Sequence, residues 1–215
     1  MGALGCNCTI VACPETKEAL VVDPGDEAPA ILDELARLGV TAVKLVHTHA
    51  HLDHVLGTAD VAARTGAAVV LHKDDRWLYD NVDMQARAFG WRAQATMRPP
   101  THEVTGGERL AFGRREATVV HTPGHTPGST CFYLDHPGET PLLFAGDTLF
   151  AGSVGRTDLW GGSFAQLDRS IRGPLFDLPD DTIVVPGHGP ETSILAEREE
   201  NPFVGKHARP GGAES

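Results

Sequence analysis

The sequence lacks any long apolar run. Its 215 residues are 41% hydrophobic, but no stretch approaches the roughly 20 consecutive apolar residues that a membrane-spanning helix needs. The first residues also lack the pattern of a secretory leader, which is a basic segment followed by an apolar core and a small-residue cleavage site. We therefore expect a cytoplasmic protein that has no membrane partner and has enough apolar residues to fill a sizeable core.

Basic residues are also scarce. Lysine and arginine number 18 against 29 aspartates and glutamates, which gives a formal net charge of -11 and a pI near 5.4. A surface that binds nucleic acid or anionic lipid needs clustered positive charge to neutralise phosphates. This charge balance argues against nucleic acid as a partner and against nuclease activity.

Cysteine is rare as well, with Cys6, Cys8, Cys13 and Cys131 in the whole chain. The Cys6-Asn7-Cys8 pair could bind metal, and a redox role is a second alternative. The residues around the cysteines have the apolar pattern of strands, so we interpret all four as core thiols. A disulfide is not expected in a reducing compartment.

The sequence does contain a dense group of metal-binding side chains. The segment Thr48-His49-Ala50-His51-Leu52-Asp53-His54 places three imidazoles and a carboxylate within six residues, directly after an apolar run. Imidazole and carboxylate together suit zinc, iron, manganese or nickel, and the absence of thiolate argues against a structural cysteine-type zinc site. Alternate residues of an extended strand point the same way, so His49 and His51 can share one ion while Asp53 and His54 face another.

Three later segments carry a further imidazole or carboxylate among glycines and prolines. They are Thr122-Pro123-Gly124-His125-Thr126-Pro127-Gly128-Ser129, Phe144-Ala145-Gly146-Asp147-Thr148 and Val185-Pro186-Gly187-His188-Gly189-Pro190. Each follows, or nearly follows, a short apolar run, which is typical of ligands on rigid turns at strand ends. A glycine precedes His125, Asp147 and His188, where the backbone has to bend closely around an ion. Together with the first segment, these residues predict a two-metal site.

In order and context, the seven residues resemble the ligand set of the metallo-β-lactamase superfamily, over nearly the whole chain. The segments Ala145 to Phe150, Gly155 to Asp158 and Pro186 to Pro190 are more narrowly similar to the glyoxalase II-like hydroxyacylglutathione hydrolases, in their short bacterial form. The resemblance implies an α/β fold, a four-layer αβ/βα sandwich, with one catalytic domain over residues 1–204. The ligand roles it implies are one metal on His49, His51 and His125, a second metal on Asp53, His54 and His188, and Asp147 as the bridge.

The same resemblance implies two divalent metal ions, with zinc favoured and iron or manganese as alternatives. The implied partner is a small-molecule thioester substrate such as S-lactoylglutathione. Two ions about 3.5 to 4 Å apart would lower the pKa of a bridging water from about 15.7 toward about 7, and the resulting metal-bound hydroxide would attack the thioester carbonyl. A thiolate leaves with little proton help because thiols ionise near about pH 8.5. Asp53 is the predicted catalytic residue, which orients the nucleophile and takes its proton.

Arg156 is the predicted substrate-binding residue. It stands where the resembled enzymes carry a glutathione-contacting lysine, and its guanidinium can pair with a carboxylate. A structural ion pair with an acidic neighbour is the alternative role for this side chain. Asp158 and Gly189 replace aromatic contact residues of the longer enzymes, so fewer contacts to glutathione are expected.

Other activities stay open on the same fold. A mononuclear iron persulfide dioxygenase shares the Gly-Arg-Thr-Asp segment, but the segment Pro186 to Pro190 retains a ligand for a second metal. A lactonase is a further alternative, whereas a β-lactamase is disfavoured because Asp147 stands where those enzymes use cysteine or serine. A non-catalytic binding module would have little reason to keep a complete two-metal set.

Strand-like and helix-like runs alternate along the chain and predict a layered α/β domain. The expected strands are Thr9 to Ala12, Ala19 to Asp23, Val43 to Thr48, Val69 to His72, Ala117 to His121, Ser129 to Leu134, Pro141 to Ala145 and Thr182 to Val185. The expected helices are Ala28 to Leu38, His54 to Thr65, Phe164 to Ile171 with Ser163 as its N-cap, and Thr192 to Glu200.

Two segments break this alternation. Residues 79–101 hold few aliphatic residues but several aromatic and methionine side chains, and are expected either to cover the site as a lid or to form a surface loop. Residues 205–215 are predicted to be a disordered tail. The remaining histidines are interpreted as hydrogen-bonded core residues, and two of them, His47 and His121, precede ligand turns and could support them. This group comprises His47, His72, His102, His121, His136 and His207.

Overall fold

The computed structural model describes residues 2–91 and 97–208. The first of its two central sheets contains five strands in the order β1-β2-β3-β4-β5. The strands are β1 Thr9–Ala12, β2 Glu18–Val22, β3 Thr41–Val46, β4 Ala68–His72 and β5 His102–Val104. β1 and β2 form an antiparallel hairpin, whereas β2 to β5 run parallel. The carboxyl ends of β2, β3 and β4 therefore lie at the same edge of this sheet.

The second sheet contains six strands in the order β13-β12-β9-β8-β7-β6. The strands are β6 Arg109–Phe112, β7 Arg115–His121, β8 Thr130–Leu134, β9 Leu142–Gly146, β12 Ile183–Pro186 and β13 Thr192–Ser193. β9 and β12 are parallel, and β7 runs in the same direction because two antiparallel pairings separate it from β9. The chain thus leaves β7, β9 and β12 at one edge. A separate hairpin, β10 Leu149–Phe150 and β11 Ser153–Val154, follows β9.

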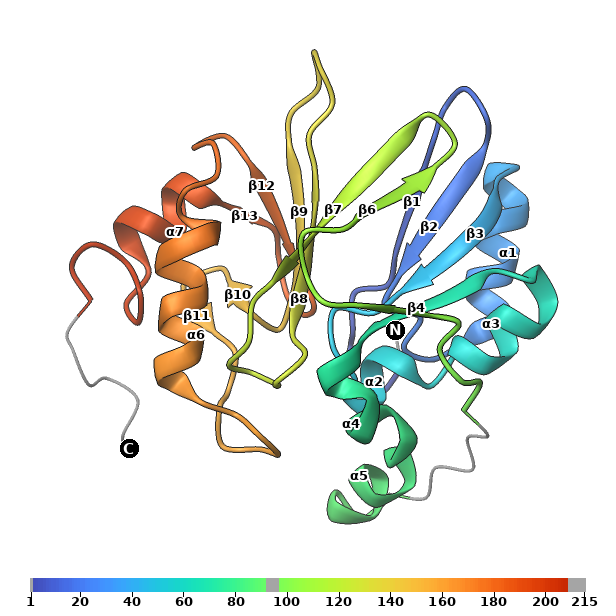
Figure 1. Ribbon diagram of the computed structural model, residues 1–215, viewed down its shortest axis with the longest axis horizontal. Helices are drawn as coiled ribbons and strands as arrows, with labels where there is room; N and C mark the ends of the chain where they lie inside the picture. The colour runs from blue at the N-terminus through green and yellow to red at the C-terminus, as the bar shows by residue number, and fades with distance from the viewer. Residues whose placement is uncertain (1, 92–96, 209–215) are drawn as a thin grey trace.

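Helices cover the outer faces of the two sheets (Figure 1). On the first sheet they are α1 Ala28–Leu38 and α3 Thr58–Thr65, and on the second they are α6 Phe164–Ser170 and α7 Ile194–Glu200. Three short helices, α2 Leu52–Val55, α4 Arg76–Asp80 and α5 Val82–Ala88, lie at the end of the first sheet. The predicted four-layer αβ/βα sandwich is confirmed. No helix of the described chain is long and apolar enough to cross a membrane.

Three apolar layers hold the sandwich together, and the alternation of side chains along each strand produces them. On β2, Val21 joins a cluster that includes Leu35 of α1, whereas its neighbour Leu20 belongs to the cluster between the sheets with Phe132. On β9, Leu143 belongs to a third cluster with Leu167 of α6. Both sheets are apolar on both faces, and this requires helices outside and a second sheet inside.

Each predicted strand is present, with ends within two residues of the expected positions, and the helix at Ala28–Leu38 is confirmed. The continuous helix expected over His54 to Thr65 is wrong. It divides into α2 and α3 at Gly57, whose N–H donates to Pro24 O at 2.9 Å instead of continuing the helix. The last helix begins at Ile194 because Thr192 and Ser193 pair with β12.

No helix was expected in residues 79–101, yet this segment contains the end of α4 and all of α5. Residues 92–96 lie outside the described part of the chain. So do residues 209–215 of the expected tail, whereas Gly205 N and Lys206 N still donate to Asn201 O and Arg198 O of the α7 region. The prediction of disorder after residue 204 therefore remains a prediction.

Candidate metal centre

The structure brings all seven predicted ligands together at the edge where the chain leaves the central strands. His49 and His51 lie on the loop after β3, and Asp53 and His54 lie on α2, which begins at Leu52. The other three follow β7, β9 and β12 and approach from the second sheet. The site therefore spans the junction of the two sheets.

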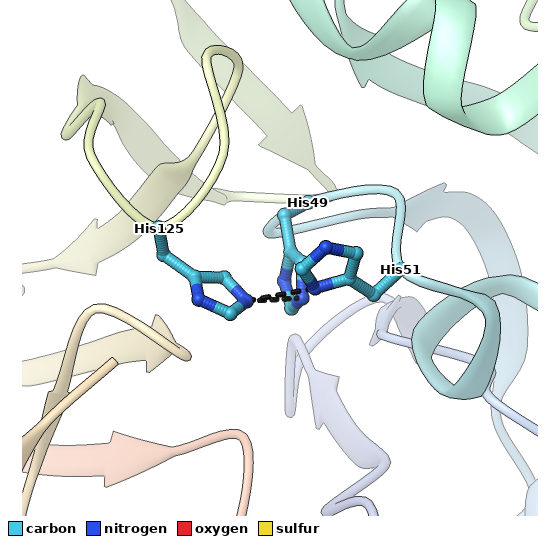
Figure 2. Close-up of side chains that lie close together, drawn as sticks. All are labelled: His49, His51 and His125. Carbon is cyan, nitrogen blue, oxygen red and sulfur yellow. Dashed lines mark hydrogen bonds between the residues drawn. The ribbon is translucent and has the colours of Figure 1, made fainter. Parts of the chain in front are cut away.

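Three imidazoles form the first cluster (Figure 2). His125 Nε2 lies 3.2 Å from His49 Nε2 and 2.8 Å from His51 Nδ1, so three ring nitrogens converge on one point. All three side chains are buried. Convergent nitrogens of this kind are the donor set of a zinc or iron site.

The second cluster combines two imidazoles with a carboxylate. His188 Nε2 lies 3.1 Å from Asp53 Oδ2 and 3.2 Å from His54 Nε2. Asp53 Oδ2 also lies 3.6 Å from His54 Nε2. These three atoms form a second set of donors that could hold an ion.

Asp147 lies between the two clusters. Its Oδ2 is 3.7 Å from His125 Nε2 in the first, and its Oδ1 is 3.5 Å from His54 Nε2 and 3.7 Å from His188 Nε2 in the second. Oδ1 is buried and has no hydrogen-bond partner among the described residues. An unsatisfied buried carboxylate oxygen is costly, so this atom fits a cation shared by both clusters.

Hydrogen bonds from the Nδ1 atoms of three ligand histidines orient their rings so that the Nε2 lone pairs face the metal clusters. His54 Nδ1 donates to Asp23 Oδ2 at 3.0 Å, and His125 Nδ1 donates to Arg156 O at 2.8 Å. Thr48 Oγ1 already donates to Asp23, so it accepts from His49 Nδ1 at 3.1 Å. In each ring the proton is thus on Nδ1 and Nε2 is free to bind a metal.

The electrostatics also fit a cation. Burial, together with the neighbouring imidazoles, places the pKa of His49 and of His51 well below the usual value, so both rings are neutral, as metal ligands must be. Burial alone would lower the pKa of His54, but Asp147 and Asp23 outweigh it and raise that pKa well above normal. Where no metal is bound, the positive charge of protonated His54 offsets the negative charges of Asp147 and Asp23.

Close packing at the centre requires glycine at two positions before a ligand. A Cβ at Gly187 would lie 2.3 Å from Asp147 Oδ1 and 2.7 Å from His54 Cε1. A Cβ at Gly124, whose φ is 145°, would lie 2.3 Å from Leu167 N. The glycines noted in the sequence therefore permit the approach of the ligand loops to each other and to α6.

Asp75 is a buried residue that the sequence did not single out. Its Oδ2 accepts from Ala50 N at 2.9 Å and Thr126 Oγ1 at 2.8 Å, and its Oδ1 accepts from Gly128 N at 2.7 Å. It therefore ties the loop that carries His49 and His51 to the loop that carries His125. No motif marks it, because its partners are two backbone N–H groups and one threonine hydroxyl far along the chain.

Two further polar residues support the site. Asp23, the last residue of the strand expected over Ala19 to Asp23, is buried and accepts from Thr48 N and Thr48 Oγ1, each at 2.7 Å. Gln85 of α5 accepts from Leu52 N at 3.1 Å and donates to Ala50 O at 2.9 Å. Both hold the segment between β3 and α2 in place.

A cavity of about 300 Å³ opens onto the cluster. Its lining includes Asp53, Asp147 and His188, and also Arg156, the predicted substrate-binding residue. Phe89 from the segment expected as a lid or loop lines it too. Ions held by the two clusters would thus face a space in which a small substrate fits.

The sequence pattern of the metallo-beta-lactamase superfamily matches residues 1–188. The chain belongs to the metallo-beta-lactamase superfamily. Among its relatives in this superfamily are the probable metallo-hydrolase YqgX of Bacillus subtilis, 36% identical over 87% of each chain, and the hydroxyacylglutathione hydrolase GloC of Haemophilus influenzae, 35% identical over 92% of each.

Solved structures of metallo-beta-lactamase proteins share the same architecture. The BLEG-1 B3 metallo-beta-lactamase is 37% identical with a TM-score of 0.86, covering 95% of this chain and 96% of the other. TTHA1623 in a di-iron-bound form is 38% identical with a TM-score of 0.84, covering 94% and 97%. ETHE1 from Myxococcus xanthus is 29% identical with a TM-score of 0.77, covering 95% and 81%.

The other histidines and the cysteines of this metallo-hydrolase lie apart from the two clusters or behind them. His47 is buried, with Nδ1 2.9 Å from Val70 O and Nε2 2.7 Å from Thr58 Oγ1, which is the arrangement of a core histidine. His121 Nε2 donates to Pro127 O at 2.9 Å and so supports the His125 loop. Cys6 is buried with Sγ 3.6 Å from His54 Nδ1, and neither it nor Cys8 belongs to a possible metal-binding group of the described chain.

Proposed function

We propose that this metallo-hydrolase cleaves small acyl thioesters, with S-lactoylglutathione as the test substrate, and that it uses two divalent ions, zinc in the first place and iron or manganese as alternatives. One observation carries the proposal: Asp147 offers one oxygen to each of two complete donor sets, beside a cavity that Asp53 also lines. The relative named hydroxyacylglutathione hydrolase GloC adds support from outside the chain.

The seven proposed ligands form two sets of three, and Asp147 is shared between the sets. The first ion would be held by His49, His51 and His125, the second by Asp53, His54 and His188, with Asp147 shared. Bound divalent ions acidify a water and polarise a carbonyl, which is the chemistry that thioester hydrolysis needs.

The chain's own residues orient the reacting groups. Asp53 faces the cavity from the first turn of α2, and we assign it the role of positioning the attacking water and accepting its proton. Trp160, with its ring centroid 6.3 Å from that of His51, helps to exclude bulk water from the first cluster. The leaving thiolate needs no strong acid, because a thiol ionises near about pH 8.5.

The test is the loss of thioester absorbance from S-D-lactoylglutathione with metal-replete protein. Asp53→Ala should reduce the rate by at least about a thousandfold, whereas Asp60→Ala, which removes an exposed carboxylate of α3, should leave it unchanged. Hydrolysis at the same rate in the Asp53 variant would contradict the assigned role. No hydrolysis by the wild type of either this thioester or its dimethyl ester would contradict the substrate class.

A second candidate function is hydrolysis of a cyclic amide or ester. The sequence disfavoured a β-lactamase, yet the BLEG-1 B3 metallo-beta-lactamase is 37% identical over 95% of this chain. A chromogenic cephalosporin and a lactone should therefore be assayed beside the thioester. A kcat/KM higher for either one would favour this alternative.

The persulfide dioxygenase alternative is less well supported. It needs one iron, whereas Asp53, His54 and His188 form a complete second donor set in this chain. Oxygen uptake with a persulfide, at one iron per chain, would favour it over hydrolysis.

A further inference from the structure

The cavity beside the metal clusters is apolar on the side away from them. This part of its lining consists of Leu4, Leu52, Phe89, Trp91 and Leu159. The described chain exposes six large apolar side chains, and three of them, Leu4, Phe89 and Trp91, line this cavity. Exposed apolar side chains that gather at one concave place mark a binding surface.

Apart from its histidines, the described lining of the cavity contains little positive charge. Arg156 is the one arginine or lysine in the lining that the structure describes, and it is already paired. Its Nε and Nη2 donate to Asp158 Oδ1 and Oδ2, each at 2.7 Å, in a two-point contact. This is the geometry in which arginine would otherwise bind a substrate carboxylate.

We propose that the Arg156–Asp158 pair sets the substrate preference of the site: it disfavours thiols that carry carboxylates and leaves the apolar wall to select thioesters of uncharged, apolar thiols. This inference rests on the proposed thioesterase function. It assigns Asp158 as a specificity-determining residue, and it moves the preferred substrate away from glutathione itself.

Charge and geometry together produce this preference. A carboxylate of the substrate must displace Asp158 from both guanidinium nitrogens, and it then lies close to the displaced negative charge. An uncharged group of the substrate does not have to displace Asp158 and is not repelled by its negative charge. It also removes Leu4, Phe89 and Trp91 from water, and each methylene that it buries there raises kcat/KM roughly fourfold.

The test compares S-D-lactoylglutathione with its dimethyl ester, in which both carboxylates are masked by methyl groups. Wild type should hydrolyse the dimethyl ester with the higher kcat/KM. Asp158→Asn frees Arg156 and should shift the ratio of the two kcat/KM values toward the free acid by roughly two- to fivefold, as expected for one exposed ion pair. Asp158→Asn combined with Arg156→Gln should lose this shift.

Asp168→Asn is the matched control. It makes the same change of charge in another surface arginine pair, that of Asp168 on α6 with Arg172, outside the cavity lining. Its ratio should equal that of the wild type. In the same way, Phe89→Ala should lower kcat/KM for the dimethyl ester about tenfold, while Trp77→Ala, at an exposed aromatic of α4 outside the lining, should not.

The outcomes separate this inference from the proposed function. Hydrolysis of both esters with a wild-type preference for the free acid, or with a ratio that Asp158→Asn leaves unchanged, overturns the inference and leaves the thioesterase in place. Hydrolysis of neither ester overturns both. A shift in Asp158→Asn that is absent in Asp168→Asn supports the inference.

Discussion

Asp75 offers a quantitative test of how the two ligand loops are held together. It is fully buried, and three donors from those loops converge on its carboxylate. Burial raises its pKa from 3.8 to about 6, although hydrogen bonds from Thr126, Gly128 and Ala50 oppose that rise. A carboxyl with a raised pKa binds its proton more tightly in the folded protein than in the unfolded chain.

The sign of the pH dependence follows from this difference. Between pH 3.8 and about 6 the folded state keeps a proton that the unfolded state has lost, so the free energy of unfolding falls as the pH rises through this window. A shift from 3.8 to about 6 corresponds to about 3 kcal/mol. In a protein of this length, that is a change in Tm of roughly 6 to 12 °C.

The assay is urea unfolding of the wild type and of Asp75→Asn, both after chelation, at several pH values from 4 to 7.5. The amide does not titrate, so the wild type should lose about 2.4 kcal/mol relative to the variant across the range, most of the full shift, while all other titrating groups cancel. A difference that stays constant with pH would refute the raised pKa. A wild type that gains relative stability as the pH rises would show that the three donors outweigh burial.

Three other substitutions test separate parts of the structure. Gly187→Ala would place a Cβ 2.3 Å from Asp147 Oδ1. The metal content should therefore fall from two ions toward one per chain, and the activity should fall by roughly a hundredfold. An unchanged metal content in elemental analysis would contradict the close approach. Thr48→Val removes the hydroxyl that accepts from His49 Nδ1 and should lower zinc affinity at least about tenfold in a chelator competition; equal affinity would show that this hydroxyl does not orient the ring. Phe132→Ala empties a buried position between the sheets and should lower the free energy of unfolding by about 3 to 5 kcal/mol in calorimetry, with kcat unchanged; a loss below about 1 kcal/mol would mean that the inter-sheet core repacks.

The ligands could be found from the sequence because they are dense, chemically distinctive and each placed after an apolar strand. His49 to His54 lie within six residues, and His125, Asp147 and His188 each follow a glycine in a turn. The same local signals located the central strands, whose apolar runs are buried on both faces. Residue type and spacing were therefore sufficient to predict a layered α/β domain and the residues that meet at its edge, whereas the four-layer arrangement came from the resemblance to the superfamily.

The supporting residues left no such signal. Asp75 acts through Ala50 N, Thr126 Oγ1 and Gly128 N, and only the folded chain brings these groups to it. Arg156 lines the cavity and also forms the ion pair with Asp158 that the sequence offered as its alternative role, while its contact with substrate stays a prediction. Contacts between distant segments decide such roles, and one sequence does not contain them.

The short elements were missed for a related reason. α4 and α5 have only five and seven residues, and their N-cap residues, Asp75 and Asn81, make no side-chain cap hydrogen bond. β6 alternates exposed and buried residues over only four positions. Their packing against longer elements, rather than local propensity, stabilises them.

The central claim is a two-ion site that performs hydrolysis, and a metal titration of the chelated protein tests it most directly. Thioester hydrolysis should be followed as zinc is added, with bound metal measured by elemental analysis at each step. Activity should rise to a plateau at two ions per chain, and Asp147→Asn should not reach this plateau. Full activity at one ion per chain, or an Asp147→Asn variant that matches the wild type, would contradict the central claim.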